Sequence, residues 1–218
     1  MTTLHTRATV LATLALSLTA QAQVWNEIGD AGRNGVGAAQ STVGTGPLTT
    51  INGSLSITTD VDLYCIRITN AALFRAEVTA YAGQDTMLYL FNADGTLQVY
   101  NDDNVSSALS TITSQGVFSS GIYFLGISNF ANIPLTGTNS FMTTINAWPG
   151  PDVQQYQSSG GVVANWNDNI TFPNNATGAY SIALEGAEFH VIPSPGAAAL
   201  LGLTSLMAAR RRSGAAGR

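Results

Sequence analysis

The chain has 218 residues, a formal net charge of −5 and no lysine. All 13 acidic residues but only three of the eight arginines fall between residues 23 and 192, so this region is more acidic than the chain as a whole. Such a surface repels phosphate backbones, and we therefore exclude nucleic acid as an expected partner. The lack of lysine also excludes a glycine-rich phosphate loop, which needs one.

The first 22 residues have the pattern of a secretory signal peptide. Arg7 gives a weakly positive start, residues 8–18 are apolar, and Ala20-Gln21-Ala22 is a cleavage site with small residues at both ends. We expect cleavage after Ala22, so that the secretion machinery exports a protein beginning at residue 23.

Residues 23–192 have the strand-and-turn pattern of one all-β domain. Runs of β-branched and aromatic residues cover Ile51–Ile57, Leu63–Ile68, Phe74–Ala80, Thr86–Phe91, Leu97–Tyr100, Ile122–Ile127 and Tyr180–Leu184. Turn signals that tolerate positive φ are Asn52-Gly53, Ala82-Gly83, Asp94-Gly95 and Ser120-Gly121. Short strands with regular turns predict a β-sandwich.

The same pattern gives four local predictions. Tyr64, Ile66 and Ile68 alternate along one strand and should face the core, with Arg67 on the opposite side. Residues 91–97 should form a hairpin, and a brief helical turn is expected within 35–40. Cys65 is the only cysteine, which excludes an intramolecular disulfide, and its apolar surroundings indicate a small core residue.

Several acidic residues stand at the predicted strand ends. Asp85 precedes one strand, and the adjacent Asp102 and Asp103 follow another; Asp60 and Asp62 precede a third. Calcium takes six to eight oxygen ligands from such loops, so Asp85, Asp102 and Asp103 are candidate metal ligands, with calcium as the one possible cofactor. The alternative is that these side chains fix turns by bonding backbone amides. Adjacency favours the alternative, because neighbours on an extended chain point to opposite sides.

Residues 131–177 form a long insertion before the last strand, with an edge hairpin expected at Gly161–Trp166. The lead-in and the insertion carry five large aromatic residues: Trp25, Trp148, Tyr156, Trp166 and Phe172. They can cap the open edge of the sandwich by burying apolar area, or stack on sugar rings of an extracellular polysaccharide. The sequence favours the cap and leaves the second interpretation open.

The residue inventory argues against an enzyme. His5 leaves with the signal peptide and His190 lies beyond the last predicted strand, in what we expect to be a stalk. The domain therefore lacks the histidine of a Ser-His-Asp triad and the ligand set of a zinc site. A pair of carboxylates across a cleft is the one catalytic arrangement left open.

Residues 193–218 carry a second targeting pattern. Pro193-Ser194-Pro195 is followed by an apolar run, Gly196–Ala209, and by Arg210-Arg211-Arg212, which should stay on the cytoplasmic side of a membrane. At about 1.5 Å per residue the run reaches roughly 21 Å, less than the ~30 Å hydrocarbon core. The pattern resembles the PEP-CTERM sorting signal, with Ser194 in the place of the usual glutamate. That resemblance implies transient insertion in the inner membrane and processing near Pro193–Pro195 by an exosortase-like enzyme.

The domain itself resembles the bacterial pre-peptidase C-terminal (PPC) domain. The resemblance lies in an ordered series of motifs over residues 47–130 and 178–186: Asp60–Tyr64, Asp85–Phe91, Asp94-Gly95, Asn101–Asp103, Gly121–Phe124 and Gly178–Ile182. The lead-in Trp25–Gly32 is similar to that of exported variants. The resemblance implies a jelly-roll-like antiparallel β-sandwich, and some collagen-binding relatives hold calcium.

Together these patterns predict a non-catalytic protein of the cell envelope or extracellular matrix, which reaches the cell surface after a transient stay in the inner membrane. The alternative is a binding module for extracellular polysaccharide or protein, stiffened by calcium. Whether the tail is removed or retained as an anchor is left open by the sequence.

Overall fold

The structure, a computed structural model, describes residues 23–83, 85–104, 106–117, 119–143, 155–156, 160–168 and 177–190. The described residues are mostly strands, with two short 3-10 turns, η1 (Val36–Ala38) and η2 (Ala71–Leu73). The expected signal peptide and sorting tail, including Ala20, Ala22, Pro193–Pro195 and Arg210–Arg212, lie outside the described residues. None of the helices in the described part is long and apolar enough to cross a membrane.

One layer is a five-stranded sheet. In spatial order it contains β1 (Val24–Asn26), β3 (Thr50–Leu55), β13 (Gly178–Glu185), β5 (Arg75–Tyr81) and β8 (Thr111–Thr113). β1 runs parallel to β3, whereas the other neighbours are antiparallel.

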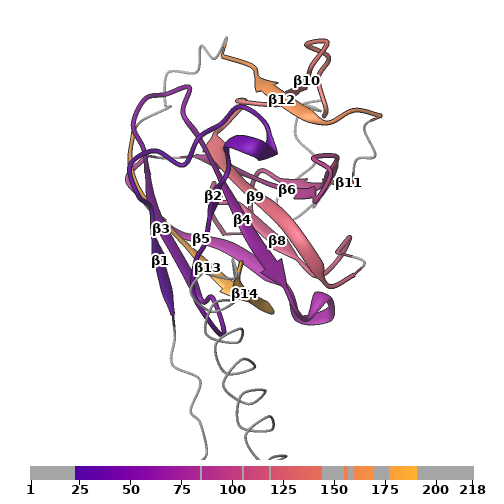
Figure 1. The fold of residues 1–218 in the computed structure, drawn as a ribbon. Helices are drawn as coiled ribbons and strands as arrows, with labels where there is room; N and C mark the ends of the chain where they lie inside the picture. Colours follow the sequence, from indigo (N-terminus) through magenta and orange to yellow (C-terminus); the bar gives the residue numbers. More distant parts are fainter. Residues whose placement is uncertain are drawn as a thin grey trace, which may run out of the picture.

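The second layer packs against the first (Figure 1). Its order is β11 (Gln155–Tyr156), β7 (Leu97–Asn101), β6 (Thr86–Asn92), β9 (Gly121–Asn129), β4 (Val61–Ile68) and β14 (Ala187–Phe189). β2 (Gln40–Ser41) adds to β4 in parallel. The β-sandwich class is therefore confirmed, but the two parallel pairs make both sheets mixed rather than purely antiparallel.

The main core lies between the two sheets. Ile51, Val78 and Ile182 from the first sheet meet Tyr64, Ile66, Ile68, Leu88, Leu90, Leu125 and Ile127 from the second, all fully or almost fully buried. Arg67 is exposed, so the predicted alternation along β4 is confirmed.

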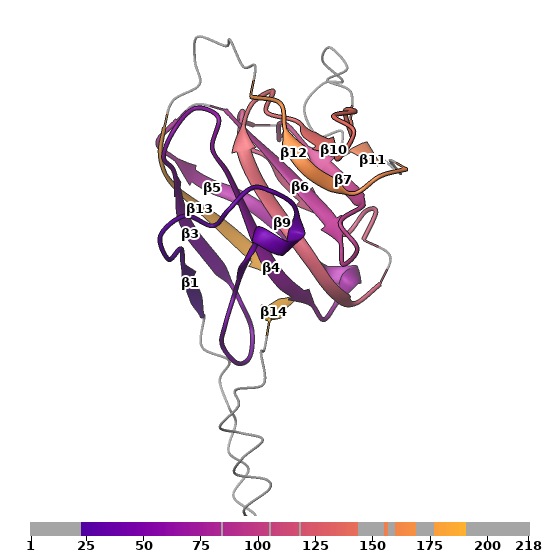
Figure 2. The same ribbon diagram turned by 45° about the horizontal axis from the view of Figure 1, so that its top comes forward.

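The outer face of the second sheet is also covered. β10 (Pro134–Thr136) and β12 (Val163–Trp166) form a two-stranded sheet beside β6 and β7 (Figure 2). A second core cluster lies there, and it includes Leu63, Tyr89, Phe91, Met142, Val163 and Trp166. The part of the insertion that the structure describes thus acts as a third layer. The hairpin expected at Gly161–Trp166 is wrong, because this segment contributes a single strand, β12, that pairs with β10.

The seven predicted runs all form strands, and β6 and β7 make the predicted hairpin. Gly95 adopts φ 87° in its turn, and η1 lies within the helical turn expected over 35–40. The prediction for Asn52-Gly53 is wrong, because both residues lie inside β3 and pair with β13. Glycine is required at residue 53 for a steric reason, because a Cβ there would stand 2.3 Å from the Tyr180 hydroxyl and 2.6 Å from that of Tyr64.

His190 does not stand in a separate stalk. The residues directly before His190 form β14, which pairs with β4. The His190 backbone N–H donates to the Thr42 hydroxyl at 3.2 Å. The sandwich therefore extends to the last described residue.

Candidate cation site at the rim of the sandwich

The structure brings together the three carboxylates that the sequence singles out. One oxygen each from Asp85, Asp102 and Asp103 lies within 4.8 Å of the other two. Asp85 directly precedes β6, and the other two follow β7. Because β6 and β7 form an antiparallel hairpin, the beginning of one strand and the end of the other meet at the same rim.

The two adjacent aspartates do not point apart as an extended chain would require. β7 ends at Asn101, and the backbone bends at Asp102, so the two-residue alternation no longer applies. The expectation that adjacency prevents both side chains from reaching one site is therefore wrong.

The loop after β7 is held against the beginning of β6 by a polar network. The Thr111 backbone N–H donates to Asn101 Oδ1 at 2.7 Å, and the Ser110 hydroxyl donates to the Thr86 carbonyl at 2.6 Å. The side chains of Thr86, Asn101 and Ser110 are buried. These bonds hold the loop backbone, whereas the Oδ1 atoms of Asp85 and Asp102 are buried without a hydrogen-bond partner.

Burial and mutual repulsion disfavour the charged forms of these carboxylates. Burial, with the nearby Asp103 charge, raises the pKa of Asp85 to about 7. Burial, with the charges of Asp85 and Asp103, raises the pKa of Asp102 to about 8, and burial also raises the pKa of Asp103. A divalent cation would relieve this repulsion and supply a partner for the buried oxygens, which a turn-fixing role would not.

A second carboxylate cluster was not predicted as a site. One oxygen each from Glu27, Asp30 and Asp62 lies within 4.8 Å of the others. In the sequence, Asp62 is notable only for preceding a strand, and the lead-in residues only as part of a resemblance. Their proximity depends on the parallel pairing of β1 with β3, which no local pattern announces.

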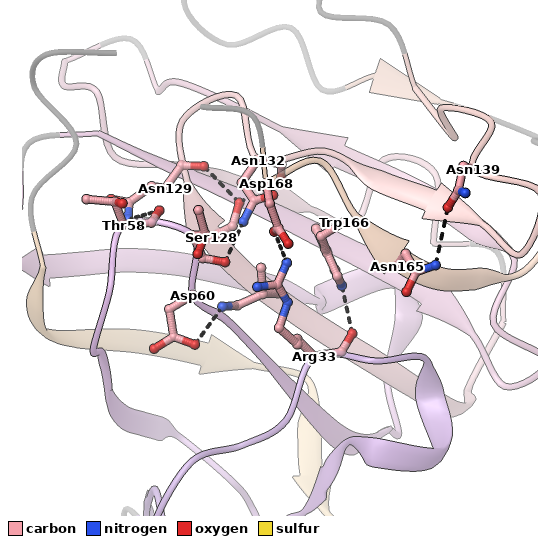
Figure 3. A network of polar contacts seen from close by, with 12 residues as sticks. Arg33, Thr58, Asp60, Ser128, Asn129, Asn132, Asn139, Asn165, Trp166 and Asp168 are labelled. Carbon is pink, nitrogen blue, oxygen red and sulfur yellow. Dashed lines mark hydrogen bonds and ion pairs between the residues drawn. The ribbon is translucent and has the colours of Figure 1, made fainter. Parts of the chain in front are cut away.

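Two of the five aromatic residues, Trp25 and Trp166, have side chains that the structure describes, and both support the cap interpretation. Trp166 is 4% exposed, packs edge-on against Tyr89 with ring centroids 5.2 Å apart, and donates its Nε1–H to the Arg33 carbonyl at 2.7 Å. Figure 3 shows this contact beside the ion pair of Arg33 with Asp168. Trp25 is half-buried and donates to Gln40 Oε1 at 2.9 Å. Trp148 and Phe172 lie outside the described residues, as does the side chain of Tyr156.

Two further features bear on chemistry. Cys65 is 5% exposed, and burial raises the pKa of its thiol to about 11, which fits a core residue rather than a nucleophile.

Two open hollows lie on the surface of the described residues. One, of about 350 Å³, is lined by Arg67, Thr69 and Ser120 among others. The other, of about 520 Å³, is lined by residues at the end of β10, in the loop after it and directly before β12. Neither has a carboxylate in its lining.

No protein-family model matches the chain, and no curated protein matches it.

Proposed function

We propose that this chain is an exported, non-catalytic β-sandwich protein of the cell envelope or extracellular matrix, whose rim loops are stiffened by calcium. The observation that carries the calcium part is the trio Asp85, Asp102 and Asp103, with two buried oxygens that have no partner. The export part rests on the sequence at the two ends, 1–22 and 193–218.

The chemistry of the site matches a hard cation better than a catalytic pair. Calcium binds carboxylate oxygens at strand ends, and extracellular modules hold it with Kd values of about 10⁻⁴–10⁻³ M. A glycosidase pair works across a cleft that admits substrate. Asp85 and Asp102 instead have buried oxygens without a hydrogen-bond partner, which favours a bound cation.

The sorting proposal follows from the resemblance of the tail to PEP-CTERM signals and of the domain to PPC domains. In this proposal the apolar run 196–209 holds the protein in the inner membrane while Arg210–Arg212 stop its transfer. An exosortase-like enzyme then processes the chain near Pro193–Pro195 and releases it to the cell surface.

Calcium binding is tested by calorimetry and thermal unfolding of residues 23–192 in 0–10 mM calcium. We expect a reversible rise in Tm that Asp102→Asn reduces strongly. Asp94→Asn is the matched control, because Asp94 is an exposed residue at the opposite end of the same hairpin, where an asparagine can still accept from Thr96. Equal calcium responses of wild type and Asp102→Asn would contradict the proposal for this trio.

Sorting is tested by mass spectrometry of the protein recovered from the cell surface and medium. We expect an N-terminus at Gln23 and a C-terminus near Pro193–Pro195. Replacement of Arg210–Arg212 by serine should release unprocessed protein into the medium. Full-length precursor in the cytoplasm, with its first 22 residues intact, would contradict export.

One observation favours a second candidate, a saccharide-binding module. Phe141 is 59% exposed and lines the 520 Å³ hollow together with Thr136, Thr138 and Ser140, whose hydroxyls hydrogen-bond to one another. An exposed ring next to hydroxyls suits stacking and hydrogen bonding to a sugar. Retention of the domain on insoluble polysaccharide, lost on Phe141→Ala, is the expected result; equal retention of both proteins would exclude this hollow.

A further inference from the structure

The cluster of Glu27, Asp30 and Asp62 joins the lead-in segment to the sandwich. Glu27 follows β1, Asp30 lies in the next loop, and Asp62 is the second residue of β4. The backbone N–H of Glu27 donates to the Asn52 carbonyl at 2.8 Å and continues the pairing of β1 with β3. The lead-in therefore places two carboxylates over a third that belongs to the second sheet.

Asp62 is the unusual member of this cluster because its side chain is fully buried. Its Oδ2 accepts from the Tyr180 hydroxyl at 2.6 Å, and the Tyr64 hydroxyl lies 2.6 Å from that of Tyr180. The Asp62 Oδ1 is buried and has no hydrogen-bond partner, and one of the two Asp62 oxygens lies within 4.8 Å of oxygens from Glu27 and Asp30. A buried carboxylate oxygen without a donor is costly, so its presence calls for a ligand.

The surrounding groups orient the cluster without neutralising it. Glu27 accepts from the backbone N–H of Ala31 at 3.0 Å and of Ser54 at 2.8 Å, one through each oxygen. These bonds fix the Glu27 carboxylate and leave it further lone pairs for a cation.

The charges around the cluster are mostly negative. Asp60 lies nearby, and its own carboxylate is already bonded to Ser56 and Val61. Among the arginines of the described residues, Arg33 pairs with Asp168 and Arg75 with Glu77. Arg67 is five residues after Asp62 in β4, so its backbone lies about 16 Å from that of Asp62, and its side chain is exposed.

We propose that Glu27, Asp30 and Asp62 form a second calcium site, which fastens the lead-in segment to the sandwich. The site is distinct from that of Asp85, Asp102 and Asp103, and no residue is shared. Both lie at the same end of the second sheet, since β4 and β6 begin there beside the end of β9. β9 lies between β4 and β6 in that sheet.

Burial and mutual repulsion disfavour the charged forms of this cluster. Burial, reinforced by the charges of Glu27, Asp60 and Asp30, raises the pKa of Asp62 to about 8, and burial also raises the pKa of Glu27.

Calcium stoichiometry by calorimetry on residues 23–192 separates the two sites. We expect two equivalents for the wild type, one for Asp62→Asn, one for Asp102→Asn and none for the double variant. The Asp30→Asn variant changes an exposed position and should fold normally. It should lower the calcium affinity of one of the two sites at least tenfold. Glu185→Gln, another exposed carboxylate change, is the control and should keep both.

The outcomes keep the two proposals apart. Loss of binding on Asp102→Asn alone, with Asp30→Asn and Asp62→Asn unchanged from the wild type, would overturn the second site and leave the first. A single equivalent that disappears on Asp30→Asn or Asp62→Asn, but persists in Asp102→Asn, would support the second site and overturn the first.

Discussion

Gly53 packs against the two tyrosines that lie next to the buried carboxylate of Asp62. The hydroxyls of Tyr180 and Tyr64 fill the space that a side chain at residue 53 would need. Tyr180 in turn donates to Asp62. The sequence signal Asn52-Gly53 resembles a turn because the same residue types serve two needs, positive φ and close approach, and only the tertiary structure distinguishes them.

We expect Gly53→Ala to destabilise the domain by about 1–3 kcal/mol through overpacking. For a domain of this size, that corresponds to a fall in Tm of roughly 2–10 °C. Gly37→Ala is the control, because a Cβ added at Gly37 would meet no atom within 4 Å and the φ of this residue is not positive. Thermal unfolding of the two variants measures the difference; equal Tm values would contradict the steric explanation.

The aspartates of the first site show how far residue-level prediction reaches. Their types and their place at strand ends were enough to single out Asp85, Asp102 and Asp103, since a hairpin closes its two outer ends onto one rim. Their burial and the bend at Asp102 could not be predicted, because they depend on the loop that returns from β7 to β8.

At the scale of elements, the strands and the two-layered sandwich were predictable, and the third layer was not. β6 is a nearly unbroken apolar run and is buried at six successive positions, because both faces of its sheet are covered. The covering layer comes from β10 and β12, which are short and pair across a long stretch of chain, so the sequence predicted a local hairpin at Gly161–Trp166 and not this pairing. Parallel pairs such as β1 with β3 also gave no local signal.

The covering layer depends on Trp166. It is 4% exposed and contacts the rings of Tyr89 and Phe91. Trp166→Ala should cost about 3–5 kcal/mol, because it leaves a large cavity over the second sheet. Phe141→Ala, at a 59% exposed ring in the same layer, should cost under about 1 kcal/mol. Denaturant unfolding measures both; a similar midpoint for the two variants would show that β10 and β12 do not hold the outer core.

At the scale of the whole molecule, the two carboxylate clusters concentrate negative charge at one end of a protein that is already acidic. Repulsion within each cluster opposes folding whenever the carboxylates are ionised. If calcium binds as proposed, it would reverse the sign of that contribution, and the folded state would be most stable where calcium is abundant.

The pH dependence of stability follows from the direction of the pKa shifts. Asp62, Asp85 and Asp102 have ordinary values of 3.8 and are raised to about 8, 7 and 8 in the folded protein. A raised pKa contributes stability that is complete below about pH 4 and is lost as the pH rises through 7–8. Without calcium, Tm should therefore fall between pH 5 and pH 8.

With 5 mM calcium the same interval should show a smaller fall, or a rise, because the ionised carboxylates bind the cation. The Asp62→Asn, Asp102→Asn double variant removes two of the titrating groups, and its calcium-free profile should be flatter than that of the wild type. Its Tm should also respond little to calcium at pH 8. The proposal would be contradicted if Tm depended on pH and calcium in the same way in both proteins. Removal of the two buried carboxylates would then have no effect on how protons or calcium couple to folding.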